Sequence, residues 1–148
     1  MGEIFLSKHK TLVKQNYIKI KQAYLKKRGI NGSWEINPHP QKKFHQAVVI
    51  PAFGELKLLP HTLTSLDKNN ASIQKNTLVV VVVNNAENSP KSILKNNQTT
   101  LKILSSKQYN FTLGVVDAAS PKLELPTKQA GVGLARKIGM DLALPHLS

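Results

Sequence analysis

The feature of this sequence that most constrains its fold is the run from Leu78 to Val83, one leucine followed by five valines. β-Branched residues favour strands, and a run this short cannot span a bilayer. A strand that is apolar on both sides must be covered on both faces, as are central strands of parallel sheets packed between helices. The run therefore predicts an α/β protein with this strand at the centre of its sheet.

Strand and helix patterns alternate on either side of this run. Two further strands are expected, over residues 47–50, ended by Pro51, and over residues 111–116, ended by Asp117. Apolar residues at helical spacing predict helices over residues 59–66, over residues 90–104 as one broken or two short helices, and over residues 131–144, where Lys137 and Asp141 would pair at i,i+4. The order βαβαβα predicts a three-layer αβα domain, partly doubly wound and Rossmann-like, with a short parallel sheet of strand order 3-2-1 or 2-1-3.

The first 44 residues do not show the alternating strand and helix patterns of the rest of the chain. Val13, Tyr17, Ile20 and Tyr24 recur at helical spacing with lysines between them, which predicts an amphipathic helix over residues 8–28. A polar stretch with two prolines follows as a linker. The sequence thus divides into residues 1–44, a helix and linker, and residues 45–148, the α/β domain.

The composition limits which partners the protein is expected to bind and in which cellular compartment it is expected to lie. The chain has 21 Lys and Arg residues against 8 acidic ones, a net charge of +13, but its basic residues are spread widely and aromatic residues make up only 5%. This pattern disfavours nucleic-acid binding by base stacking, although a basic nucleic-acid-binding protein remains an alternative. The sequence shows no transmembrane run and no signal sequence, and it has no cysteine, so we expect a cytoplasmic protein without disulfides.

Several familiar site motifs are absent. The segment Gly131-Val-Gly-Leu-Ala-Arg resembles a dinucleotide-binding turn, but Arg136 replaces its third glycine. The five histidines lack metal-site spacing, and no serine sits in a G-x-S-x-G turn. The remaining candidates are the polar and aromatic residues that follow the strands. They are Phe53 and Glu55 after the first strand, Asn84 and Asn85 after the second, Asp117 after the third, and Arg136 in the last helix.

In three segments, over residues 48–55, 78–85 and 131–139, the chain resembles the family 2 glycosyltransferases of GT-A fold. The first strand of that family ends in a Pro-Ala/Thr-Tyr-Asn-Glu-like turn, its second ends in an Asp-Asp or Asn-Asn pair, and a later helix carries an Ala-Arg-Asn-x-Gly-like sequence. The resemblance covers residues 46–144. It implies a nucleotide-diphosphate sugar as donor and an unknown acceptor, either a glycan or lipid-linked.

The resemblance also assigns residues to the site. Pro51, Ala52, Phe53 and Glu55 would line the slot for the base, with Phe for Tyr and Gly54 for Asn. Asn84 and Asn85 would pair with the edge of the base, since an amide supplies both a donor and an acceptor. Arg136 would contact the base or phosphates, with Lys137 in place of the usual Asn, and Asp117 completes the set at the third strand.

The family's next strand ends in an Asp-x-Asp-like motif that holds a divalent metal on the diphosphate. This sequence contains no Asp-x-Asp, so we expect no metal (Mn or Mg) and no catalytic residue within it, and no sugar transfer by the isolated chain. The chain would then be the N-terminal, nucleotide-recognising part of a glycosyltransferase-like protein, truncated before that strand. The alternative is a non-catalytic α/β nucleotide-binding module.

Each candidate residue also has a structural interpretation. Phe53 fits a core position, Glu55 a first-turn acid of the following helix, the Asn pair and Asp117 ordinary turns, and Arg136 and Lys137 a solvated helix face.

Overall fold

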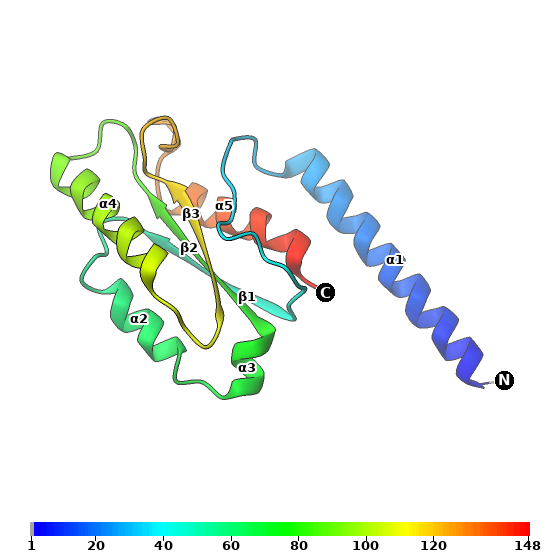
Figure 1. Ribbon diagram of the computed structural model, residues 1–148. Coiled ribbons are helices and arrows are strands. Elements are labelled where there is room, and N and C mark those ends of the chain that lie inside the picture. The colour runs from blue at the N-terminus through cyan, green and yellow to red at the C-terminus, as the bar shows by residue number, and fades with distance from the viewer. Residues whose placement is uncertain (1) are drawn as a thin grey trace. The chain divides into compact units, whose positions relative to one another are not determined.

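The computed structural model describes residues 2–148 and forms two compact units, one ending at Asn31 and the other comprising Gly32–Ser148. Figure 1 shows the elements in chain order. The first unit is the helix α1 (Gly2–Arg28). The second contains β1 (Gln46–Ala52), α2 (Leu59–Leu66), α3 (Ala71–Asn76), β2 (Thr77–Asn84), α4 (Lys91–Ser106), β3 (Thr112–Ala118), α5 (Val132–Ala143) and the 3₁₀ turn η1 (Leu144–His146). None of the helices within residues 2–148 is long and apolar enough to cross a bilayer.

The sheet is parallel throughout, with strand order β1-β2-β3. Ala47 lies opposite Leu78 in the first pair of strands, and Leu78 lies opposite Thr112 in the second. The 3-2-1 order is therefore confirmed. Every residue of β2 is buried, as a strand covered on both faces requires.

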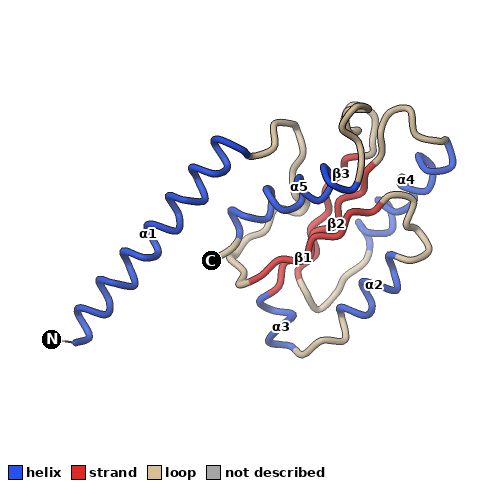
Figure 2. Tube along the Cα trace, turned by 180° about the vertical axis from the view of Figure 1, so that it is seen from behind, coloured by secondary structure: helices blue, strands red, loops and turns tan. Residues whose placement is uncertain are grey.

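Helices lie on both faces of the sheet (Figures 1 and 2). On one face, Leu59 and Leu63 of α2 and Leu104 of α4 form a cluster with the odd-numbered valines of β2. On the other face, α5 crosses β1 and β2 so closely that Gly139 abuts Val49 and Val82. The second unit is therefore a three-layer αβα arrangement.

The structure differs from the sequence prediction at several element boundaries. β1 continues through Pro51 to Ala52, which is possible because an edge strand has one side where a missing N–H costs no ladder hydrogen bond. The helix before β3 is continuous, and Pro90 stands as its N-cap residue. The prediction missed α3, whose N-terminus is capped by the Asn70 side chain accepting from the Ile73 N–H at 2.9 Å.

The division between the units also lies earlier than predicted, between Asn31 and Gly32 instead of after residue 44. Residues 32–44 belong to the α/β unit because they pack on its sheet. Ile36 and Phe44 are buried, and Asn37 forms an antiparallel bridge with Val115 of β3. Helix α1 begins at Gly2, whereas the apolar pattern predicted that it starts at residue 8.

Candidate functional site

The carboxyl ends of the three parallel strands meet at one edge of the sheet. Ala52 ends β1, Asn84 ends β2 and Ala118 ends β3. In open α/β sheets this edge is where ligands bind. The candidate residues that follow the strands therefore lie at one edge, as expected from a parallel sheet.

The centre of this edge is a buried asparagine that sequence reasoning missed. Asn97 of α4 is only 1% exposed. Its Nδ2 donates to the backbone oxygen of Asn84 at 2.9 Å and to Oδ1 of Asn85 at 2.8 Å, while its Oδ1 accepts from the Gly54 N–H at 3.0 Å. One side chain thus ties α4 to the ends of β1 and β2.

The Asn84-Asn85 pair has two different roles. Asn85 is bonded inward: its Nδ2 donates to the backbone oxygens of Ala86 and Ala119, and its backbone oxygen accepts from the Leu125 N–H at 2.9 Å. Its side chain therefore holds the edge together and is not available to a ligand.

The side chain of Asn84 uses its Nδ2 group, but not its Oδ1, in hydrogen bonds within the described residues. Its Nδ2 donates to the backbone oxygens of Ala52 at 3.2 Å and Val82 at 3.1 Å, and these are the hydrogen bonds of its side chain within the described residues. In residues 2–148 no fully buried side-chain oxygen or nitrogen lacks a partner. The unbonded Oδ1 of Asn84 is therefore not fully buried, although the residue as a whole is only 3% exposed at the carboxyl edge.

The turn after β1 presents an aromatic ring from a fixed backbone. Phe53 is 48% exposed and so is not a core residue. The next residue, Gly54, has a φ of +69°, and the Leu56 N–H donates to Oδ1 of Asn96 at 3.2 Å. Two consecutive asparagines of α4 thereby fix the backbone on either side of Glu55, whose side chain is half-buried.

Asp117 is the penultimate residue of β3, and its side chain organises the loop that follows. Its Oδ1 accepts from the backbone N–H groups of Ala119 at 3.0 Å and Ser120 at 2.8 Å. This is the turn role that the sequence left open as its structural interpretation. Gln98 of α4 reaches the same loop, donating to the Ser120 hydroxyl at 3.2 Å.

Helix α5 supplies the two cations that the resemblance assigned. Arg136 is exposed one turn before Gly139, the residue that packs on the sheet. Lys137 is engaged elsewhere: its Nζ lies 2.6 Å from Oδ2 of Asp141, whose side chain is 3% exposed. The expected i,i+4 pair is confirmed, and it directs Lys137 toward a buried carboxylate.

The first turn of α5 is open. The positions that a Cβ would occupy at Gly131 and Gly133 have no neighbouring atom within 4 Å, and Val132 between them is exposed. Unpaired N–H groups at a helix N-terminus favour anions. This turn therefore offers room for a negatively charged group on the same helix as Arg136.

A separate cavity of about 780 Å³ lies beside β3, on the α4 side of the sheet. Leu101, Leu104, Phe111, Leu113 and Val115 contribute its apolar lining. Of the nine predicted site residues, Asp117 alone lines it. Tyr109 also lines it, stacked on Phe111 at 4.9 Å between ring centres, and burial together with the Asp67 carboxylate raises the pKa of the Tyr109 hydroxyl.

A signal for the missed asparagine was present in the sequence. Asn97 lies in register with Leu101 and Leu104, on the stripe of α4 that faces the core. A polar residue on such a stripe must be hydrogen-bonded when it is buried. Its partners are two backbone groups and the side chain of Asn85, all 12 or more positions away in the sequence, and no local pattern identifies them.

The described residues contain no cluster of three or more His, Asp or Glu side chains that could hold a metal ion. Comparison with models of protein families, with curated proteins and with solved structures finds no match to this chain.

Proposed function

We propose that the carboxyl edge of this sheet binds a nucleoside diphosphate, as the nucleotide-recognising part of a glycosyltransferase-like protein. The observation that carries the proposal is the position of Phe53 and Asn84 at adjoining strand ends. Asn84 donates to the backbone oxygen of Ala52, the residue directly before Phe53. An exposed aromatic ring and an amide oxygen that is unbonded within the described residues, on a side chain only 3% exposed, therefore lie at adjoining strand ends.

These two groups suit a nucleobase. The ring of Phe53 offers a stacking face, and Oδ1 of Asn84 accepts a hydrogen bond from an imide N–H such as that of uracil. The phosphates would extend toward the open first turn of α5 and Arg136. Glycosyl transfer itself rests on the resemblance of the three segments to family 2 glycosyltransferases.

The path of the chain after α5 supports a doubly wound sheet. Phe44 donates to the backbone oxygen of His146 at 2.9 Å and accepts from the Ser148 N–H at 2.8 Å, which places Leu147 in a parallel bridge with it. The next residue, His45, donates instead to Asn76, before β2. The chain thus returns to the open side of β1, where a doubly wound sheet reverses its strand order.

The test is calorimetric titration of the full chain with uridine diphosphate. We expect saturable binding that weakens about tenfold in Phe53→Ala, since base stacking on an aromatic ring is worth roughly 1–3 kcal/mol. Leu58→Ala, at another exposed apolar residue of the same connection, is the matched control and should bind normally.

A second pair of variants tests the phosphate contact. Arg136→Gln should weaken binding of the diphosphate more than binding of uridine, whereas Lys128→Gln, in the exposed loop before α5, should change neither. Absence of saturable uridine diphosphate binding contradicts the proposal. Tight binding of a short DNA or RNA with a steep salt dependence would favour the nucleic-acid alternative.

A further inference from the structure

Helix α1 concentrates the charge of the chain. Its 27 residues include eight of the 21 Lys and Arg residues but only one acidic residue, Glu3. It therefore carries more than half of the net charge of +13. A charge density of this kind on one helix favours an anionic partner surface.

The helix also exposes an apolar sector. At about 100° per residue, six large apolar side chains fall within about 140° of its circumference. They are Leu6, Leu12, Val13, Tyr17, Ile20 and Tyr24, each between 38% and 66% exposed. His9, Asn16 and Lys27 are the polar residues within this sector.

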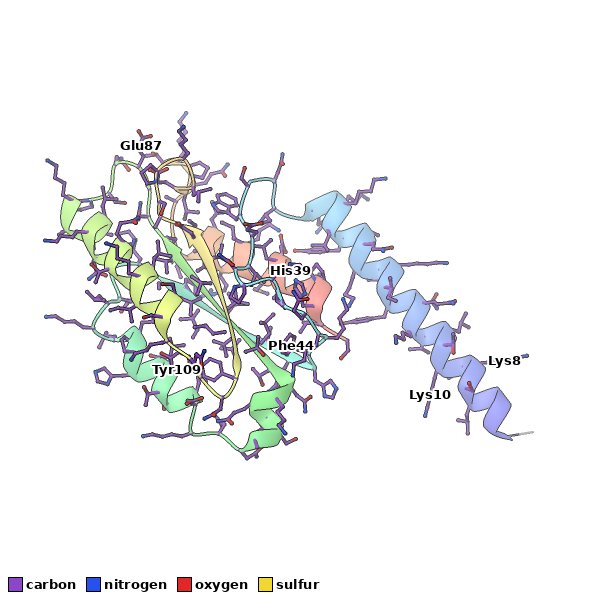
Figure 3. All side chains as sticks on the ribbon, in the orientation of Figure 1. Lys8, Lys10, His39, Phe44, Glu87 and Tyr109 are labelled. Carbon is purple, nitrogen blue, oxygen red and sulfur yellow. The ribbon has the colours of Figure 1, made fainter. Side chains whose placement is uncertain are left out.

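Cations run along both borders of the apolar sector in two rows. Lys8, Lys19 and Lys26 follow one border, and Lys10, Lys14, Lys21 and Arg28 follow the other. Figure 3 shows Lys8 and Lys10 projecting from different sides of the helix. From residue 6 to the end of α1, the middle of the remaining face has no charge; it consists of Ser7, Thr11, Gln15, Ile18, Gln22 and Leu25.

This arrangement distinguishes between possible partners. On a phosphate backbone of nucleic acid the apolar sector would have no counterpart. A second copy of α1 would bring like charges together along both borders. A single acidic helix would cover the apolar sector but could not surround it on two sides.

A lipid bilayer provides a counterpart for the apolar sector and for both rows of cations at the same time. A helix lying in the interface sinks its apolar side chains between the acyl chains and has headgroups along both flanks. Lysine stems extend along the helix and carry their ammonium groups up to those headgroups. Tyrosines such as Tyr17, whose ring is covered by Lys21 Nζ at 4.5 Å, are favoured at this depth.

We propose that α1 binds the surface of an anionic membrane, lying parallel to the bilayer with its apolar sector inserted. This interaction is reversible, because it combines shallow insertion with electrostatic attraction and involves no spanning segment.

The test uses the full chain and two kinds of lipid vesicle, one of phosphatidylcholine alone and one of equal parts phosphatidylcholine and phosphatidylglycerol. Flotation should recover the chain with the mixed vesicles and not with the neutral ones. Raising the salt concentration should release it, since screening weakens the attraction. Equal binding to both vesicles, or to neither, overturns the proposal.

Two isoleucines of α1 provide a matched pair of variants that tests which face of the helix is inserted into the membrane. Ile20 is in the apolar sector and Ile18 faces away from it, and both are exposed. Ile20→Ser should weaken binding to the mixed vesicles about tenfold, and Ile18→Ser by less than about twofold. Equal effects of the two substitutions would overturn the inserted orientation.

A charge variant completes the test. Lys10→Gln combined with Lys14→Gln should weaken binding to the mixed vesicles by about tenfold or more. Circular dichroism of each variant confirms that its helix content is unchanged. A double-stranded DNA oligonucleotide serves as the competitor: binding to it that is unaffected by Ile20→Ser, without binding to vesicles, would assign α1 to nucleic acid instead.

Discussion

The side chain of Asn97 accepts a hydrogen bond from the backbone N–H of Gly54 at 3.0 Å, across 43 positions of sequence. The same side chain donates to the end of β2. The two bonds to the end of β2 are buried and the bond from Gly54 is partly buried, so leaving these groups without partners is costly. The position of Phe53 at the candidate site therefore depends on an asparagine of α4.

We predict that Asn97→Ala destabilises the chain by about 2–4 kcal/mol, because it leaves buried backbone and side-chain groups of three residues without partners. The measurement is urea unfolding followed by the fluorescence of Trp34. Asn88→Ala, at an exposed turn residue, is the control and should unfold within about 0.5 kcal/mol of the parent. Equal stability of the two variants would show that the network is not a major support of the edge.

Gly54 should not tolerate a side chain. Its φ of +69° disfavours an L-residue, and a Cβ there would lie 2.7 Å from Cδ1 of Ile93. We expect Gly54→Ala to cost about 2 kcal/mol in the free energy of unfolding and to weaken uridine diphosphate binding by moving Phe53. Introducing Ile93→Val as well removes the clashing atom, so the double variant should recover part of the loss. No recovery would mean that backbone strain accounts for the whole effect.

Two glycines of α5 are expected to respond in opposite ways to alanine. Gly139 packs against Val49 and Val82, so Gly139→Ala overfills this contact and should destabilise the chain by about 1–3 kcal/mol. At Gly133 the space is open, so Gly133→Ala should stabilise it by up to about 1 kcal/mol through helix propensity. Thermal unfolding of both variants measures the difference. A loss of stability at Gly133 would contradict the open first turn.

The sequence was informative where the physics is local. The valine run identified the buried central strand, because a short β-branched run that is apolar at every position fits a strand covered on both faces. The i,i+4 spacing identified the Lys137–Asp141 pair, because helix geometry alone brings such residues together. Both features depend on residues close in the sequence.

The sequence was less informative where contacts are distant. It placed Asn85 among ligand-binding residues, but the side chain bonds to Asn97 and to the backbone after β3. It also placed residues 32–44 outside the domain, although Asn37 pairs with Val115 of β3. Such pairings are set by tertiary packing, for which a polar, proline-containing segment gives no periodic signal.

The last prediction concerns pH. Burial, together with the neighbouring His39 and Lys43, lowers the pKa of His146 from its ordinary value of 6.5. The His39 and His146 rings meet edge to face with their centres 5.0 Å apart. The folded chain therefore takes up a proton at His146 less readily than the unfolded chain, and the free energy of unfolding should fall as the pH drops below about 6.5.

We expect His146→Asn to remove this part of the acid sensitivity, since only the backbone oxygen of residue 146 is bonded to Phe44 and the substitution retains it. His39→Asn should reduce the sensitivity by a smaller amount, because it removes one of the neighbouring charges while burial remains. Urea midpoints measured at neutral pH and near pH 5 test both expectations by the difference between variant and parent. If His146→Asn loses as much stability on acidification as the parent, then protonation of His146 does not control the anchoring of the last residues beside β1.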